Sequence, residues 1–356
     1  MFNKFASSSI GGVWSSSPID EQVVRRAELY LEKILKKNDV SNAESVAISA
    51  AALFLKENDL LLKGLVKSHT DLMENFGLDE AIILFQNDCP FGFNEIKCES
   101  AFKGHENFDI LFDIASHGAR RTISETFCPQ SYEVHSTSHQ NKFSDVFLAH
   151  ALKSAMEGQA MIIETSKIPI EMAKQLHYSD NVFTSKPGVD LGRCCINLSK
   201  NKKDCILNTP LSKLGAEALY GKASMPSIGD ICMGIVSFAK SLGVQIPDLF
   251  AFKDDISKAH NQNKYSLADV KVSCCVNLKH GYSIINTRCL FGDNISNDVF
   301  DIVARGADIN IESLSNEKLV KAFNTRYVDD HQSYALLQDA LKSQKTPKSL
   351  LKKLRG

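Results

Sequence analysis

The residues best suited to chemistry lie near the C-terminus, in the run Tyr327-Val328-Asp329-Asp330. Neighbouring side chains on a strand point to opposite faces of a sheet, so two adjacent Asp cannot share one metal ion within a strand. At a tight hairpin turn this alternation breaks, and both carboxylates can face the same cleft. Asp is also common in turns for reasons of backbone conformation. A solvated hairpin tip is therefore the alternative interpretation of this pair.

A second acidic pair, Asp254-Asp255, follows the apolar run at 249–252. Carboxylates at the C-terminal end of a strand lie on the rim of the sheet, where open α/β layers bind their ligands. The structural alternative is a helix cap, because either Asp could accept hydrogen bonds from the helical turn predicted at about 257–262. The pattern alone does not choose between the two.

Two cations, Lys186 and Arg193, stand seven residues apart around the turn-forming pair Pro187-Gly188. This spacing predicts a β-hairpin that carries both side chains. Arg offers a planar fork for phosphate, and Lys offers a point charge. Taken one at a time, each is more simply explained as a surface cation.

In their order along the chain, these segments resemble the reverse transcriptase family over roughly residues 180–338. Asp255, Ala259 and His260 are similar to the palm motif Asp-x-x-x-Ala-aromatic, and residues 327–330 match the Tyr-x-Asp-Asp box. The other matching residues lie in two segments that resemble the nucleotide-pocket helix and the fingers hairpin of the family: Leu290, Phe291, Gly292, Ser296 and Phe300, and Lys186, Arg193, 194–199, Leu207 and Asn208. The Phe-Gly form of the pocket motif, together with His117-Gly118-Ala119, is similar to DIRS-like retroelement enzymes.

The resemblance implies templated, Mg²⁺-dependent addition of deoxynucleotides to a primer 3′-hydroxyl. Its partners would be deoxynucleoside triphosphates and an RNA or DNA template with its primer. Two Mg²⁺ ions about 3.5–4 Å apart, or Mn²⁺ in their place, can serve such phosphoryl transfer. The residues that the resemblance assigns are Asp255, Asp329 and Asp330 as catalytic metal ligands, and Lys186, Arg193, Ala259, His260, Phe291 and Gly292 for nucleotide binding.

Several positions depart from the family pattern. His260 replaces the usual Phe or Tyr beneath the sugar, Asn297 replaces Pro, and Asp293 is expected to add a negative charge near the triphosphate. The sequence continues for only 26 residues past Asp330, which implies a missing thumb and impaired catalysis. One alternative is a catalytically silent palm remnant that binds nucleic acid or a partner. Another is a helical scaffold protein with coincidental motifs.

The surrounding pattern predicts an α+β fold: a helical N-terminal module, then polymerase fingers and a palm, a ferredoxin-like antiparallel sheet with helices on one face. Strands are expected at 194–198, 249–252, 270–278, 283–290 and 323–328, with His280-Gly281 as a hairpin turn. Those in 249–336 should form one sheet. Helices are expected at 143–157, 170–176, 213–220, 228–242 and 296–305, with Ser41 as an N-cap and Gly77 as a stop. The predicted regions are 1–19 disordered, 20–176 helical with a loop-rich boundary at 85–107, 177–248 fingers, 249–340 palm and 341–356 a basic tail.

Composition bounds the possible functions. The chain has 356 residues, 44% of them hydrophobic, enough for two or three domains. The formal net charge is −1, and the tail after Asp339 holds six cations and no acid, so the rest carries −7. The ten Cys show no Cys-x-x-Cys zinc spacing. With no signal-peptide pattern and no apolar run near the ~20 residues that span a bilayer, we expect no membrane contact and a cytoplasmic or nuclear location.

Overall fold

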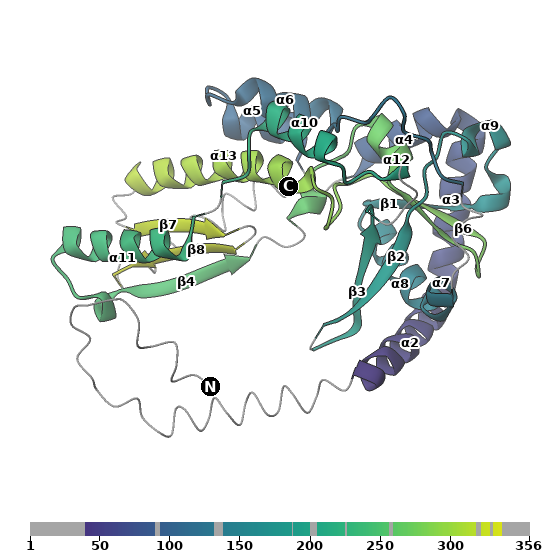
Figure 1. The fold of residues 1–356 in the computed structure, drawn as a ribbon, viewed down its shortest axis with the longest axis horizontal. Coiled ribbons are helices and arrows are strands. Elements are labelled where there is room, and N and C mark those ends of the chain that lie inside the picture. Colours follow the sequence, from purple (N-terminus) through teal and green to yellow (C-terminus); the bar gives the residue numbers. More distant parts are fainter. Residues whose placement is uncertain are drawn as a thin grey trace.

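The fold combines helices with small antiparallel sheets, as the α+β prediction requires (Figure 1). The computed structural model describes residues 40–89, 93–131, 138–186, 188–199, 205–224, 226–255, 259–317, 322–327 and 330–336. Its α-helices are α2 (Val40–Glu57), α3 (Asp59–Phe76), α4 (Leu78–Asp88), α5 (Glu95–Phe102), α6 (Phe108–His117), α7 (Ser138–Lys142), α8 (Ser144–Met156), α9 (Ile170–Ala173), α10 (Pro210–Tyr220), α11 (Ile228–Leu242), α12 (Leu267–Val272) and α13 (Ser296–Glu317). Its strands are β1 (Ala160–Glu164), β2 (Asp180–Lys186), β3 (Val189–Asn197), β4 (Phe250–Asp255), β5 (Cys274–Asn277), β6 (Tyr282–Asn286), β7 (Ala322–Tyr327) and β8 (Asp330–Ala335).

The N-terminal helices largely follow the sequence prediction. Gly77 ends α3 with a positive φ of 79°, and its N–H donates to the carbonyl of Met73. The prediction that Ser41 is an N-cap is wrong, because α2 already includes Val40. The predicted loop at 85–107 is wrong in part, since α5 lies within it, capped by the Asn94 side chain.

The first sheet has the strand order β1-β6-β5 and lies between helices of the N-terminal half. We expected one sheet from the strands in 249–336, and that expectation is wrong. β5 and β6 form the predicted hairpin around Gly281, but β6 pairs with β1, a strand that the sequence did not reveal. All three strands are almost completely buried. Strands buried on both faces show no polar alternation from which register could be read.

The prediction of a strand over 270–278 is correct only at its C-terminal end. Residues Leu267–Val272 form α12, because the side chain of Ser266 accepts a hydrogen bond from the N–H of Asp269 and caps the helix. The strand β5 begins only at Cys274.

The last sheet has the order β4-β8-β7 and is separate from the first. Helix α11 packs against it through Phe238, whose ring centroid lies 6.4 Å from that of Phe323 on β7. The approach is so close that a Cβ on Gly234 would lie 2.2 Å from the Phe323 ring. The helix therefore needs glycine at this point to reach the sheet.

His69 on α3 gives the fold a sensitivity to acid. The buried ring accepts a hydrogen bond at Nδ1 from the N–H of Ile162 on β1, and burial lowers its pKa from 6.5 to about 4. The unfolded chain takes up a proton near pH 6.5 and the folded chain does not. The favourable contribution of the neutral His69 ring to the free energy of unfolding is therefore fully present above pH 6.5. It is lost as the pH falls toward 4, in total by about 3 kcal/mol.

We therefore expect His69→Asn, which keeps an acceptor near the Nδ1 position, to lose less stability than the original chain between pH 6.5 and 4. Urea unfolding at a series of pH values measures the difference. Parallel stability curves for the two chains would contradict the role of His69.

Candidate functional site

One residue from each acidic pair of the sequence lies at the same end of the β4-β8-β7 sheet. The antiparallel register places Asp255, the last residue of β4, opposite Asp330, the first residue of β8. On its other side Asp330 lies opposite Tyr327, the last residue of β7. Directly opposed residues of an antiparallel pair have Cα atoms about 4.5–5.5 Å apart and share one face of the sheet. The sheet thus brings together carboxylate residues that are 75 positions apart in the chain.

Asp329 lies outside the described residues, as do the side chains of Asp255 and Asp330. What the structure describes is the backbone that carries them: β7 ends at Tyr327 and β8 begins at Asp330. Among the side chains that are described, no group of three His, Cys, Asp or Glu is placed to hold a metal ion. Asp254 and Asp255 both belong to β4, and the residue that caps the following 3₁₀ helix at His260–Gln262 is Ala259. The backbone therefore does not support the interpretation of Asp254 or Asp255 as a helix cap.

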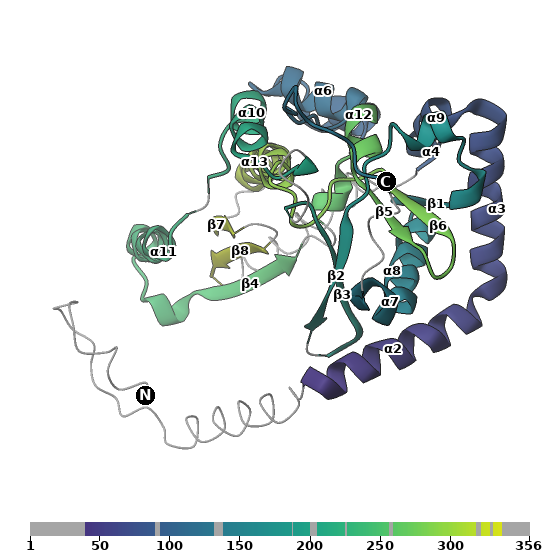
Figure 2. The same ribbon diagram turned by 45° about the vertical axis from the view of Figure 1, so that its right-hand side comes forward.

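The predicted hairpin around Lys186 and Arg193 is present as β2 and β3. Thr184 pairs with Arg193 and Lys186 pairs with Val189, so three residues of β3 bulge opposite one residue of β2. Gly192, with φ 60°, lies in the bulge, where a Cβ would approach the Phe183 ring to 2.5 Å. The bulge lets Leu191 pack against α2 and α8 while Arg193 remains exposed. Figures 1 and 2 both show the C-terminal end of β4 pointing toward this hairpin.

Ala259, His260 and Phe291 are brought together beside α13. The His260 ring centroid lies 5.7 Å from that of Phe291 and 5.5 Å from that of Phe300, and Ala259 packs with Phe300 and Ala304. His260 is only 6% exposed, whereas Phe291 is 61% exposed. The exposed aromatic surface at this place is therefore Phe291.

The loop before α13 is tied to the segment that follows the hairpin. The amide of Asn208 donates to the carbonyl of Gly292 at 2.9 Å, and its oxygen accepts from the N–H of Asn294 at 3.0 Å. Two sequence motifs that lie about 85 residues apart are thus in direct contact. This contact fixes the position of Gly292, whose φ of 91° requires glycine.

A network of buried charged side chains also holds the loop before α13. The Arg121 guanidinium donates to Asp269 at 2.7 Å and to Asp293 at 2.5 Å, and all three side chains are almost completely buried. The Tyr265 hydroxyl donates to Asp293 and accepts from the N–H of Leu290. The expectation that Asp293 adds a negative charge near a triphosphate is wrong, because its carboxylate is buried and neutralised by Arg121.

The electrostatics of the network follow from burial. Burial raises the pKa of Asp269, although Arg121 and Ser266 oppose the shift. Burial alone would lower the pKa of Arg121, but the carboxylates of Asp293 and Asp269 raise it overall. Burial and the Asp293 charge raise the pKa of Tyr265, so its hydroxyl keeps its proton and remains a donor. No local sequence pattern pointed to Arg121 or Asp269.

No family model matches the chain, and no curated protein has a significantly similar sequence. Among the helices in the described ranges, none is both long enough and apolar enough to cross a bilayer.

Proposed function

We propose that this chain has a reverse transcriptase-like site, in which Asp255, Asp329 and Asp330 hold two Mg²⁺ ions for templated addition of deoxynucleotides to a primer. The observation that carries the proposal is the register of β4 and β8. It sets Asp255 opposite Asp330 at the end of a sheet, and Asp329 directly precedes Asp330 in the sequence. Carboxylate oxygens are the protein ligands that Mg²⁺ prefers.

Paired metal ions, when bound, stabilise the attacking and leaving oxygens of phosphoryl transfer. The chain's own residues would position the substrate. Arg193 and Lys186 on the β2–β3 hairpin would contact the triphosphate, because both are exposed and the end of β4 points toward that hairpin. Phe291 offers an exposed aromatic face next to His260, on a loop that Asn208 and Arg121 hold in place.

The second candidate is a palm-like protein that binds nucleic acid or a partner without catalysis. One observation favours it: His260 is buried between Phe291 and Phe300, so little of its ring is open to a sugar. The −7 charge of the chain before its basic tail also opposes tight binding of a duplex, since each phosphate contact needs a cation.

Primer extension distinguishes the two candidates. The intact chain is incubated with a primed RNA or DNA template, deoxynucleoside triphosphates and Mg²⁺ or Mn²⁺. The proposal expects a low but template-directed extension that requires the metal. Template binding without any extension, in either metal, would favour the binding protein and contradict the catalytic assignment.

A further inference from the structure

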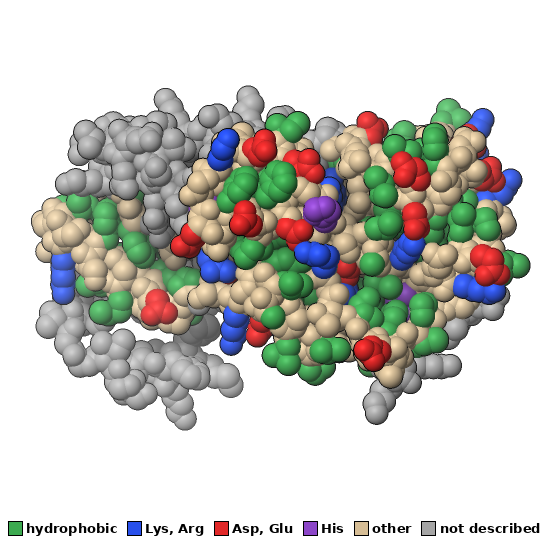
Figure 3. All heavy atoms as spheres, turned by 90° about the horizontal axis from the view of Figure 1, so that it is seen from above, with side chains coloured by type: hydrophobic (Ala, Val, Ile, Leu, Met, Phe, Trp, Pro, Cys, Tyr) green, Lys and Arg blue, Asp and Glu red, His purple; other side chains and the backbone are tan. Residues whose placement is uncertain are grey.

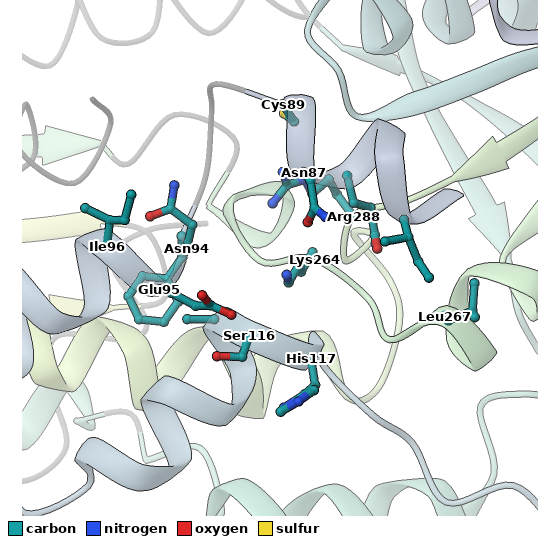
Figure 4. A pocket seen from close by; sticks show the side chains of 14 residues that line it. Asn87, Cys89, Asn94, Glu95, Ile96, Ser116, His117, Lys264, Leu267 and Arg288 are labelled. Carbon is teal, nitrogen blue, oxygen red and sulfur yellow. The ribbon is translucent and has the colours of Figure 1, made fainter. Parts of the chain in front are cut away.

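A separate cavity is lined by residues of α4, α5 and α6. It is a pocket of about 590 Å³, within the range of about 300–1,000 Å³ that is typical of small-molecule sites. Figure 4 shows Lys264 near its centre, with Glu95 to one side and Arg288 to the other. None of the residues assigned to the proposed polymerase site lines this pocket.

The two cations of the pocket are placed by the backbone. Lys264 and Arg288 face each other in an isolated antiparallel bridge, so both side chains leave the bridge on the same side. The Gln86 amide on α4 donates to the carbonyls of Tyr265 and Thr287, one residue from each cation. The bridge is therefore fixed to α4, and so is the backbone that carries the two cations.

The charge of the pocket favours an anion. Among the described residues that line it, Glu95 is the only acid, against Lys264 and Arg288. Burial lowers the pKa of Lys264, and the neighbouring Arg288 lowers it further. Burial, and to a smaller extent the charge of Arg288, also lower the pKa of Lys97 on α5. An anion bound between these groups would offset their mutual repulsion.

The surrounding surface does not supply this preference. The face that carries α5, α6 and α10 shows acidic and basic side chains interspersed with apolar ones, with no broad patch of one sign (Figure 3). The preference for an anion would therefore come from the residues that line the pocket. The rest of the lining combines apolar side chains such as Phe93 and Leu267 with the amides of Asn87 and Asn94, which suits an organic group attached to the anion.

We propose that this pocket binds a phosphomonoester of mononucleotide size, with its phosphate between Arg288 and Lys264. Arg supplies a planar fork that matches phosphate oxygens, and Lys supplies a point charge beside it. The phosphate can belong to a free mononucleotide or to the 5′ end of a nucleic-acid strand.

The test is calorimetric titration of the full chain with adenosine monophosphate and with adenosine, at constant ionic strength. We expect binding of the monophosphate only, weakened about tenfold by Lys264→Gln because one charged contact is lost. Glu95→Gln should bind it several-fold more tightly, because the opposing carboxylate is gone. The matched controls are Lys63→Gln and Glu99→Gln, which replace residues outside the pocket lining and should not change the affinity.

Binding of adenosine as tightly as the monophosphate, or an affinity unchanged in both Lys264→Gln and Glu95→Gln, would overturn the proposal, as would no binding at all. The source of the phosphate is resolved by competition. A 5′-phosphorylated oligonucleotide that displaces the monophosphate, where the unphosphorylated strand does not, supports a strand end. Displacement by neither strand, with monophosphate binding intact, supports the free nucleotide.

Discussion

Asp255→Asn should reduce metal-dependent nucleotide addition to the background level, whereas Asp254→Asn should leave most of it. The two residues are neighbours in β4, and neighbouring positions of a strand belong to opposite faces of a sheet. Asp255 pairs with Asp330 and Asp254 pairs with His331. The amide keeps the size of the side chain but removes the charge that a divalent ion requires. Primer extension with Mg²⁺ measures the effect.

If the intact chain extends primers poorly, a second measurement can still test the roles of Asp255 and Asp254. Mn²⁺ binding, followed by electron paramagnetic resonance in the presence of a deoxynucleoside triphosphate, reports the metal site without turnover. We expect Asp255→Asn and Asp329→Asn to weaken Mn²⁺ binding and Asp254→Asn to leave it unchanged. Equal effects of Asp254→Asn and Asp255→Asn would show that the carboxylates act only through general charge.

Arg121→Met should destabilise the folded chain by about 3–5 kcal/mol, a large part of the 5–15 kcal/mol that stabilises a typical domain. The reason is that Asp269 and Asp293 would remain buried without their counter-charge. The neighbouring residue is a matched control. The Arg120 side chain is 52% exposed and pairs with Asp113 at the surface, so Arg120→Met should cost at most about 1 kcal/mol.

Urea unfolding of the two variants measures the difference. If Arg121→Met yields no folded protein, the triple replacement Arg121→Met, Asp269→Asn, Asp293→Asn should recover part of the stability, because it removes the uncompensated charges as well. Similar losses in Arg120→Met and Arg121→Met would contradict the assignment of a buried network. The network also holds the loop that carries Phe291 and Gly292.

The features that the sequence predicted correctly are those with a local cause. Helix α11 occupies 228–242 as predicted, with Ser227 capping its start and Gly243 in the left-handed conformation at its end. The hairpin around Gly188 follows from turn chemistry within a few residues. The acidic pair at the end of β4 was visible because only Lys253 separates it from the apolar run at 249–252. The assignment of these segments to a polymerase palm and fingers remains a prediction.

The tertiary structure alone decided which segments meet. β1 gave no alternating pattern because it is buried, and its pairing with β6 joins residues more than 110 positions apart. The burial of Asp293 beside Arg121 could not be read from either segment, because the two residues lie 172 positions apart and neither segment contains its partner. The fold brings these opposite charges together and removes both from water, and the cost of leaving either one unpaired there then maintains the pairing. The register of Asp255 and Asp330 was also decided by the tertiary structure: local sequence placed each residue at a strand end, and the pairing of β4 with β8 set the two backbone positions opposite each other.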